Sequence, residues 1–191
     1  MPTNLKVLSF YALFSKNYLD KFESILKKEV NLLPKFREQN KLNYFDSKKE
    51  LIRTFRYSFF LRAYAYFESY LINECNELME RYQLKLSIND IQGKSLLKRI
   101  DKYFTKVAGL RSPEYLRSWG NLIVYNHLRN IIIHKNGYVD DLNKYSELKV
   151  FMKNTKLISI DKENHIYLNK LFNFKVISNL SHFIQNYKNY K

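Results

Sequence analysis

Cysteine, proline and glycine are all scarce in this chain of 191 residues, which holds one cysteine, three prolines and four glycines. So few turn-forming residues disfavour a sandwich or barrel of short β-strands, because such folds need many tight turns. The lone cysteine, Cys75, has no second cysteine in the chain with which to form a disulfide. These shortages predict a helical protein of a reducing compartment.

Long hydrophobic runs are missing as well. The apolar stretch from Val7 to Phe14 is much shorter than the ~20 residues that a membrane-spanning helix needs. No small-residue cleavage site follows it, so it does not fit a secretory signal. The sequence therefore predicts a soluble cytoplasmic protein that is not inserted in a membrane.

The short motifs that mark many enzyme classes are also lacking. The chain has no GxxxxGK[ST] loop, no GxGxxG turn and no HExxH pair, which are typical of nucleotide hydrolysis, dinucleotide redox chemistry and zinc proteases. Its carboxylates, histidines and single cysteine do not show the spacing of a metal site. We therefore expect no cofactor and no metal.

Acidic residues are few compared with basic ones. The 33 lysines and arginines exceed the 18 aspartates and glutamates, which gives a formal charge of +15. Such a charge attracts polyanions, and nucleic acid is the common partner of that kind. An anionic membrane surface or an acidic protein is an alternative, and a coding bias toward Lys, Asn, Ile and Tyr produces the same charge with no polyanion partner.

What the chain does have is helical periodicity over most of its length. Apolar residues at three- and four-residue spacings predict a helix over 7–32. The capping-box pattern "SKKE" at 47–50 opens a long helix that reaches about Gln83. A third helix is predicted over 95–109, and a fourth over 112–135, where a serine cap precedes a proline at the first helical position.

The C-terminal part changes character. Two β-prone runs, "KLISI" and "HIYLN", flank a four-residue turn and predict a hairpin over 156–169. An amphipathic helix is predicted over 171–187. We therefore expect one all-α domain over 1–191, a bundle of about five helices with a small β-hairpin before the last helix.

The stretch "LRNIIIHKNG" near the end of the fourth helix places three polar groups in an apolar run. Asn130 and His134 are four residues apart, so they share a helical face and the amide can orient the imidazole. Arg129 and His134 are five residues apart, which separates them by about 140° around a straight helix. Two copies related by a two-fold axis could bring together the groups that one copy holds apart.

Histidine and arginine suit the cleavage of a phosphodiester. Carbonyl dipoles at a helix C-terminus favour the protonated form of a histidine there. One imidazole can take the proton of a ribose 2′-hydroxyl while a second gives a proton to the leaving oxygen, and a guanidinium stabilises the charge that develops. This chemistry needs no metal.

The motif resembles the signature of the HEPN superfamily, in which an arginine precedes a histidine by four to six residues and a polar residue often follows the arginine. The stretch "LRAYAYFESYLINECNEL" at 61–78 is similar to the aromatic-rich helix of HEPN ribonucleases, and the resemblance covers about 50–187. It implies a helical bundle, a homodimer and metal-independent RNA cleavage that leaves a 2′,3′-cyclic phosphate. Members of this group serve as toxins of toxin–antitoxin systems and as abortive-infection effectors in phage defence, so an antitoxin or regulatory protein is a further expected partner. One branch of the family has a tyrosine two residues after the histidine, where this chain has Asn136.

The resemblance assigns roles to individual residues. Arg129 and His134 would be catalytic, Asn130 and Glu68 would be auxiliary or orienting, and Lys135 is a candidate phosphate contact. A helix-end histidine that caps carbonyl groups, with an arginine in a surface salt bridge, would give the same pattern. A non-catalytic HEPN-like module that binds nucleic acid or protein is therefore the alternative, and a helical protein that docks on a membrane surface or a partner is a third.

Overall fold

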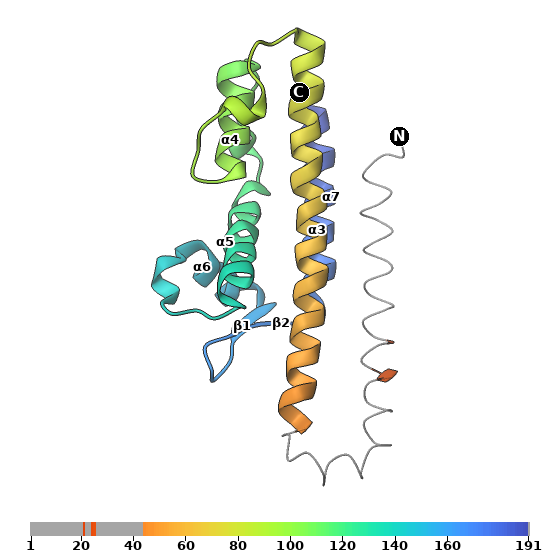
Figure 1. The fold of residues 1–191 in the computed structure, drawn as a ribbon, viewed down its shortest axis with the longest axis vertical. Helices are drawn as coiled ribbons and strands as arrows, with labels where there is room; N and C mark the ends of the chain where they lie inside the picture. The colour runs from red at the N-terminus through yellow and green to blue at the C-terminus, as the bar shows by residue number, and fades with distance from the viewer. Residues whose placement is uncertain (1–20, 22–23, 26–43, 191) are drawn as a thin grey trace.

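The computed structural model of the chain describes residues 21, 24, 25 and 44–190, and side chains over 49–187. In this part of the chain five α-helices and one antiparallel hairpin are present (Figure 1). In order they are α3 (Tyr44–Tyr82), α4 (Leu96–Lys102), α5 (Trp119–Lys135), α6 (Ser146–Thr155), β1 (Ile158–Ile160), β2 (Ile166–Leu168) and α7 (Phe172–Tyr190). The mostly helical architecture is confirmed, whereas the helix predicted over 7–32 falls almost wholly outside the described residues.

Three of the predicted elements are confirmed by the structure. The long helix is α3, which is described over 39 residues from Tyr44, so Ser47, the predicted start, lies within it. The hairpin expected over 156–169 forms with Ile158 opposite Leu168. The helix expected over 171–187 is α7.

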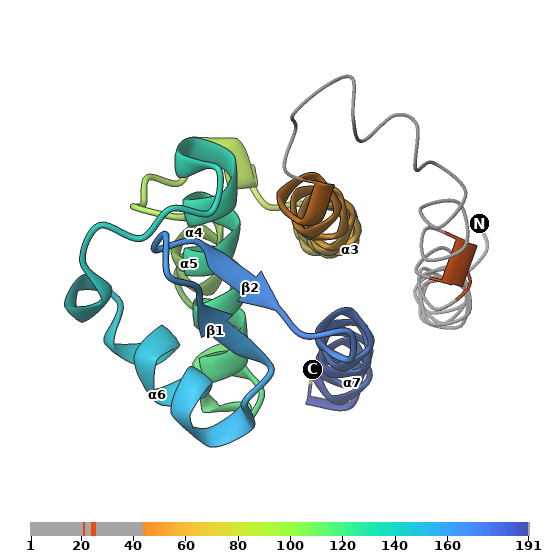
Figure 2. The same cartoon turned by 90° about the horizontal axis from the view of Figure 1, so that it is seen from below.

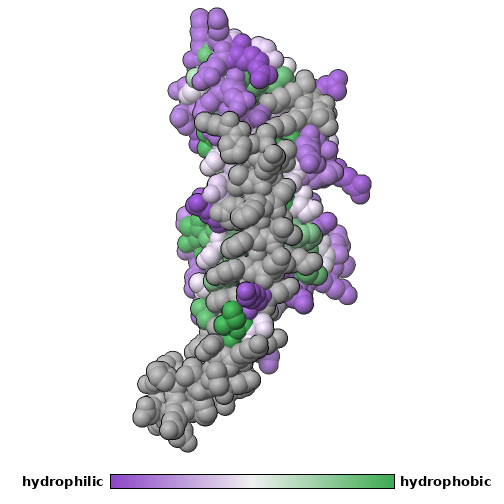
Figure 3. All heavy atoms as spheres, turned by 90° about the vertical axis from the view of Figure 1, so that its right-hand side faces the viewer, coloured by the Kyte–Doolittle hydropathy of each residue, from purple (hydrophilic) through white to green (hydrophobic). Residues whose placement is uncertain are grey.

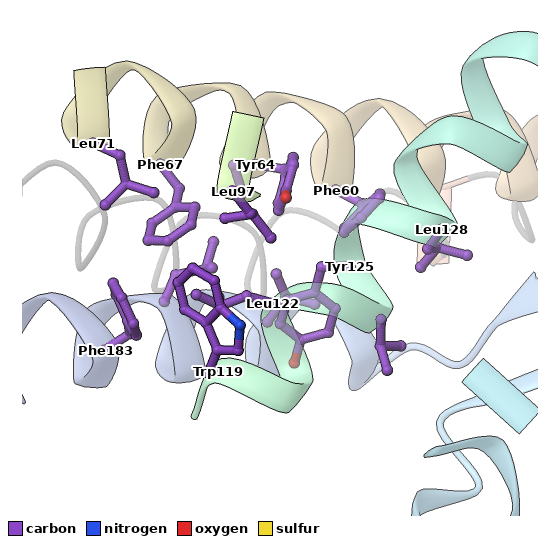
Figure 4. Packing of buried hydrophobic residues seen from close by; sticks show 14 of the residues in the cluster. Phe60, Tyr64, Phe67, Leu71, Leu97, Trp119, Leu122, Tyr125, Leu128 and Phe183 are labelled. Atoms are coloured by element: carbon purple, nitrogen blue, oxygen red, sulfur yellow. The ribbon is translucent and has the colours of Figure 1, made fainter. Parts of the chain in front are cut away.

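The core is built on an aromatic stripe along α3. Phe60, Tyr64 and Phe67 recur at spacings of three and four residues, which places them on one face of the helix. They meet Tyr125 of α5 and Phe183 of α7, and all five side chains are almost fully buried (Figure 4). The helices α3, α5 and α7 therefore share one hydrophobic core, which fixes α5 against its neighbours. Figure 2 looks along α3 and α7 and shows α5 beside them.

The fourth predicted helix starts later than expected, at Trp119 and not at 112. Ser112 does act as a cap, since its hydroxyl oxygen accepts from the Glu114 backbone N–H at 3.1 Å, but it caps only a single 3₁₀ turn. That turn is tied to α4, because the Ser112 hydroxyl donates to Asp101 at 2.5 Å and Lys98 pairs with Glu114. The serine cap predicted from the sequence is therefore present, but the contacts with α4 end the helical turn after Tyr115, and α5 begins separately at Trp119.

The helix α6 was not predicted. It has only ten residues, of which Leu148 and Phe151 are buried, and no side chain caps its first turn. The third predicted helix, over 95–109, is present as α4 followed by a π-helical turn at Tyr103–Val107. No helix in the described part of the chain combines the length and the apolarity needed to cross a membrane.

Candidate active site at the end of α5

The end of α5 is closed by two residues in the left-handed backbone conformation. Asn136 has φ 48° and Gly137 has φ 81°. The Gly137 N–H donates to the carbonyl oxygen of Ile131 at 3.1 Å, which satisfies one of the free carbonyl groups of the last turn. Gly137 therefore closes the helix, and it fixes the backbone just after His134.

Gly137 is also the point where α3, α5 and the hairpin meet. A side chain at this position would overlap the hydroxyl of Tyr57 on α3. That hydroxyl donates to the Ile166 carbonyl oxygen at 2.5 Å, and the Ile166 N–H donates to the Gly137 carbonyl oxygen at 2.8 Å. Three segments that are distant in sequence thus hold the end of the motif helix.

Arg129 is half-buried on α5, and its position is set by its neighbour. Its Nη1 donates to Oδ1 of Asn130 at 3.0 Å. Among the described residues no hydrogen bond joins Asn130 to His134. The sequence suggested that the Asn130 amide orients His134. In this structure the amide orients Arg129 instead.

Two residues of α3 lie within electrostatic reach of Arg129. Burial raises the pKa of the Glu68 carboxyl, and the positive charge of Arg129 opposes this with a smaller effect. Burial likewise raises the pKa of Tyr64, with a further increase from Glu68 and an opposing decrease from Arg129. The Tyr64 side chain is 1% exposed, and its hydroxyl has no hydrogen-bond partner within the described residues. Tyr64 was not among the site residues predicted from the sequence, where its only signal is its place one turn before Glu68.

His134 is exposed in the last turn of α5. Ile133 beside it is 49% exposed, and Tyr138 beyond the cap is 42% exposed. The histidine therefore stands on a partly apolar surface at the anchored end of the helix. Because they are five positions apart along a helix of regular pitch, Arg129 and His134 point in directions that differ by about 140°.

The other three histidines all have neighbours that engage their rings. His127 lies 3.8 Å from the Glu147 carboxylate, and His182 lies 3.1 Å from the Asn186 amide. The ring of His165 packs edge-on against Tyr138. All four histidines belong to the described residues, and among these residues only His134 makes no such contact.

Lys135 carries an acidic partner. Its ammonium lies 2.9 Å from Asp140 Oδ1, while Lys144 lies 3.4 Å from the other oxygen of the same carboxylate. The hydrogen bond from Lys135 is the largest cause of the lowered pKa of Asp140. A phosphate contact by Lys135 would therefore compete with an existing ion pair.

One group of side chains has ligand atoms close enough to hold a metal ion. The side chains of Asp161, Glu163 and His165, at the hairpin turn, bring one ligand atom each within 4.8 Å of one another. Asp161 is already engaged, because it pairs with Lys49 at 2.8 Å and accepts from the backbone N–H groups of Glu163 and His165. These bonds hold the hairpin turn in shape, and they explain why the three side chains lie close together.

Comparison of the chain with protein-family models, with curated proteins and with solved structures found no match. The geometry around Arg129 and His134 is therefore what carries a functional assignment.

Proposed function

We propose that this chain is a metal-independent endoribonuclease of the HEPN type, with a composite site formed by Arg129 and His134 of two copies. The observation that carries the proposal is the state of His134, the one exposed histidine without a partner among the described residues. It stands on a helix end that three segments hold in place. Its neighbour Arg129 is oriented by Asn130 and lies within reach of Glu68.

The reaction is an intramolecular attack within the RNA. The His134 imidazole of one copy takes the proton of a ribose 2′-hydroxyl, and that oxygen attacks the adjacent phosphorus. The bond from phosphorus to the 5′-oxygen breaks, and the protonated imidazole of the second copy gives its proton to that oxygen. The guanidinium of Arg129 stabilises the extra negative charge on the phosphorus centre. The products are a 2′,3′-cyclic phosphate and a free 5′-hydroxyl.

A two-fold assembly solves two problems of the single chain. One histidine cannot easily serve as base and acid in the same step, and Arg129 and His134 point in different directions. The exposed side chains of Ile133 and Tyr138 beside His134 offer apolar surface for a contact between copies. A protein that sediments as a strict monomer at micromolar concentration and retains full activity would contradict the composite site.

The biological role that follows is that of a cytoplasmic growth-arresting toxin or phage-defence effector, held in check by an antitoxin or a regulatory protein. Induced expression of the chain should then stop bacterial growth. Expression of the His134→Ala variant should not.

The main experiment incubates purified protein with labelled single-stranded RNA in the presence of EDTA. The His134→Ala and Arg129→Ala variants should each lose cleavage by a factor of about 10²–10⁴. Because His134 is exposed, its substitution should leave the melting temperature unchanged. His182→Ala is the matched control, since it removes another exposed histidine of the same chain.

Two results would contradict the proposal. If His134→Ala cleaves at the wild-type rate, the motif is only a helix end. If the wild-type protein retains RNA without cleaving it, the chain is the non-catalytic binding module instead.

A further inference from the structure

A cavity of about 560 Å³ lies between α5, α6 and α7, on the N-terminal half of α5. Its apolar surface includes Val124 and Phe151, both of which belong to the buried core. Val150, which is 59% exposed, contributes apolar surface on the α6 side. A volume of this size is in the range of small-molecule sites, and polar groups from all three helices line it together with the apolar residues.

Three asparagines, one on each helix, face this cavity: Asn121 of α5, Asn154 of α6 and Asn179 of α7. The Asn179 amide nitrogen donates to the Tyr125 hydroxyl at 2.7 Å. The side-chain amides of Asn121 and Asn154 have no hydrogen-bond partner within the described residues. An amide offers both donors and acceptors, so these groups can read the polar edge of a ligand that lies on the apolar surface.

Gly120 lies on the exposed rim of the cavity. It lies in the first turn of α5 and lines the cavity, and a side chain built there would meet no atom within 4 Å. Glycine is a poor helix former, and here neither a close neighbour nor a left-handed backbone requires it. The missing side chain leaves open space at the cavity wall.

The charges at the cavity suit a ligand with an anionic group and an amino group. Lys175 of α7 is exposed on one wall and has no ion-pair partner in the described part of the chain. Glu147 of α6 also lines the cavity; one of its carboxylate oxygens accepts from the Ser146 hydroxyl at 2.9 Å and lies 3.8 Å from His127, and the other oxygen can accept a hydrogen bond from a ligand. A nucleotide has both features when its base carries an exocyclic amine.

We propose that this cavity is a subsite for one unpaired nucleotide of the RNA whose base carries an exocyclic amine, that is adenine, cytosine or guanine and not uracil. The face of the base would lie on the apolar surface, its exocyclic amine would be read by the asparagines and Glu147, and its phosphate would meet Lys175. This inference rests on the proposed function, because that function supplies the RNA. The thirteen residues from Asn121 to His134 span about 20 Å of helix, so the recognised base lies several nucleotides from the cleaved bond.

The test measures binding with the His134→Ala protein, so that the RNA stays intact. Fluorescence anisotropy is recorded with labelled hexanucleotides of adenine, cytosine or uracil. We expect adenine and cytosine strands to bind about 5- to 100-fold more tightly than uracil strands. The Gly120→Leu substitution, which fills the open space, should abolish that preference, whereas Gly120→Ala should retain most of it.

A second pair of variants tests the subsite even if the Gly120→Leu protein does not fold. Lys175→Gln should weaken binding of all three strands, while Lys153→Gln, a matched exposed lysine of α6, should not. Competition with free AMP separates the two sources of an adenine nucleotide. If micromolar AMP displaces the strand from the cavity, the site takes free nucleotides and the RNA subsite is overturned.

Failure of the subsite and failure of the nuclease give different results. If wild-type protein cleaves RNA and Gly120→Leu keeps the same affinity and the same base preference, the subsite is wrong and the nuclease stands. If wild-type protein does not cleave, but base-selective binding is present and is lost in Gly120→Leu, the nuclease is wrong and the subsite stands.

Discussion

Gly137 and Gly120 differ in the space around them and in backbone conformation, so they contribute differently to the stability of the fold. Gly137 has a left-handed backbone and the Tyr57 hydroxyl directly against its Cα. Gly120 lies in an ordinary helical turn with open space above it. Of these two glycines, Gly137 is the one that the fold itself requires.

The substitution Gly137→Ala should therefore lower the free energy of unfolding by about 2 kcal/mol or more. The left-handed conformation costs a non-glycine residue roughly 1–2 kcal/mol, and the clash with Tyr57 adds to this. Urea denaturation followed by circular dichroism measures the change. Gly120→Ala is the control and should raise stability by up to about 1 kcal/mol. Equal stability of the two variants would contradict the close approach at Gly137.

The carboxyl of Glu68 gives the fold a pH dependence of known sign. Burial raises its pKa above the ordinary value of 4.5, so the folded state holds this proton more tightly than the unfolded chain does. As the pH rises from below 4.5 through the raised pKa, the folded protein must give the proton up and its stability falls. Glu68→Gln has no proton to lose. The stability of the wild type relative to this variant should therefore fall across that window and stay constant above it.

Thermal unfolding of both proteins between pH 4 and pH 8 measures this difference. Other titrating groups affect both proteins alike and cancel in the comparison. A difference that increases with pH would show that attraction to Arg129 outweighs burial.

At the scale of the elements, α3 and the hairpin are joined by buried polar bonds. The Tyr57 hydroxyl donates to the Ile166 carbonyl oxygen in a buried setting. Arg56 Nη1 donates to the Leu168 carbonyl oxygen at 2.6 Å and to the Tyr167 hydroxyl at 2.9 Å. These bonds lock the hairpin to the helix that carries the aromatic stripe.

Tyr57→Phe should lower the free energy of unfolding by about 1–3 kcal/mol, because it leaves a buried carbonyl oxygen without its donor. Tyr167→Phe is the matched control, since Tyr167 is partly exposed and Arg56 keeps its bond to Leu168. Its effect should stay within about 0.5 kcal/mol. If the two variants lose the same stability in urea, the buried bond of Tyr57 is not what holds the hairpin.

The helices that could be predicted from the sequence are those with a regular stripe of buried hydrophobic residues. Phe60 to Leu78 of α3 and Phe172 to Ile184 of α7 show the three- and four-residue spacing of a buried helical face. The start of α5 could not be predicted, because the cap at Ser112 is a local signal that contacts with α4 restrict to one turn. The short helix α6 carries too few buried positions to show a period.

The same division holds for the candidate site. The motif itself and the glycine cap are visible in the sequence, because both depend on local spacing. The approach of Glu68 to Arg129 and the contact of Gly137 with Tyr57 are set by packing between elements. Sequence spacing within one helix contains no information about which side chains of another helix will face it.

Across the whole molecule, exposed cations gather where α3 ends and α4 lies, at the opposite end of the structure from the hairpin (Figure 1). Figure 3 shows this end as a hydrophilic surface. Its exposed basic residues are Arg81, Lys85, Lys94, Lys98, Lys102 and Lys106, and the exposed acidic residues Glu77, Glu80, Asp90 and Glu114 lie among them, with Lys98 paired to Glu114. A strand of RNA that contacted both this end and the site at His134 would run along most of the molecule.

RNA binding should consequently weaken steeply as salt concentration rises. Each phosphate neutralised on a single strand contributes about −0.7 to the slope of log affinity against log salt. Titration of the His134→Ala protein with labelled RNA between 50 and 200 mM salt, at constant pH, measures the slope. A flat response would identify the charge of +15 as a compositional bias with no role in binding.

The bonds between α3 and the C-terminal quarter of the chain also bear on its synthesis. Tyr57 and Ile166 are separated by 109 residues, and Asn173 donates to the Arg56 carbonyl oxygen across 117 residues. The aromatic face of α3 leaves the ribosome long before the hairpin and α7 that cover it. At about 5–20 residues per second the nascent chain exposes this face for several seconds or more. During translation the buried face of α3 is therefore exposed to binding by a chaperone until the hairpin and α7 have been made.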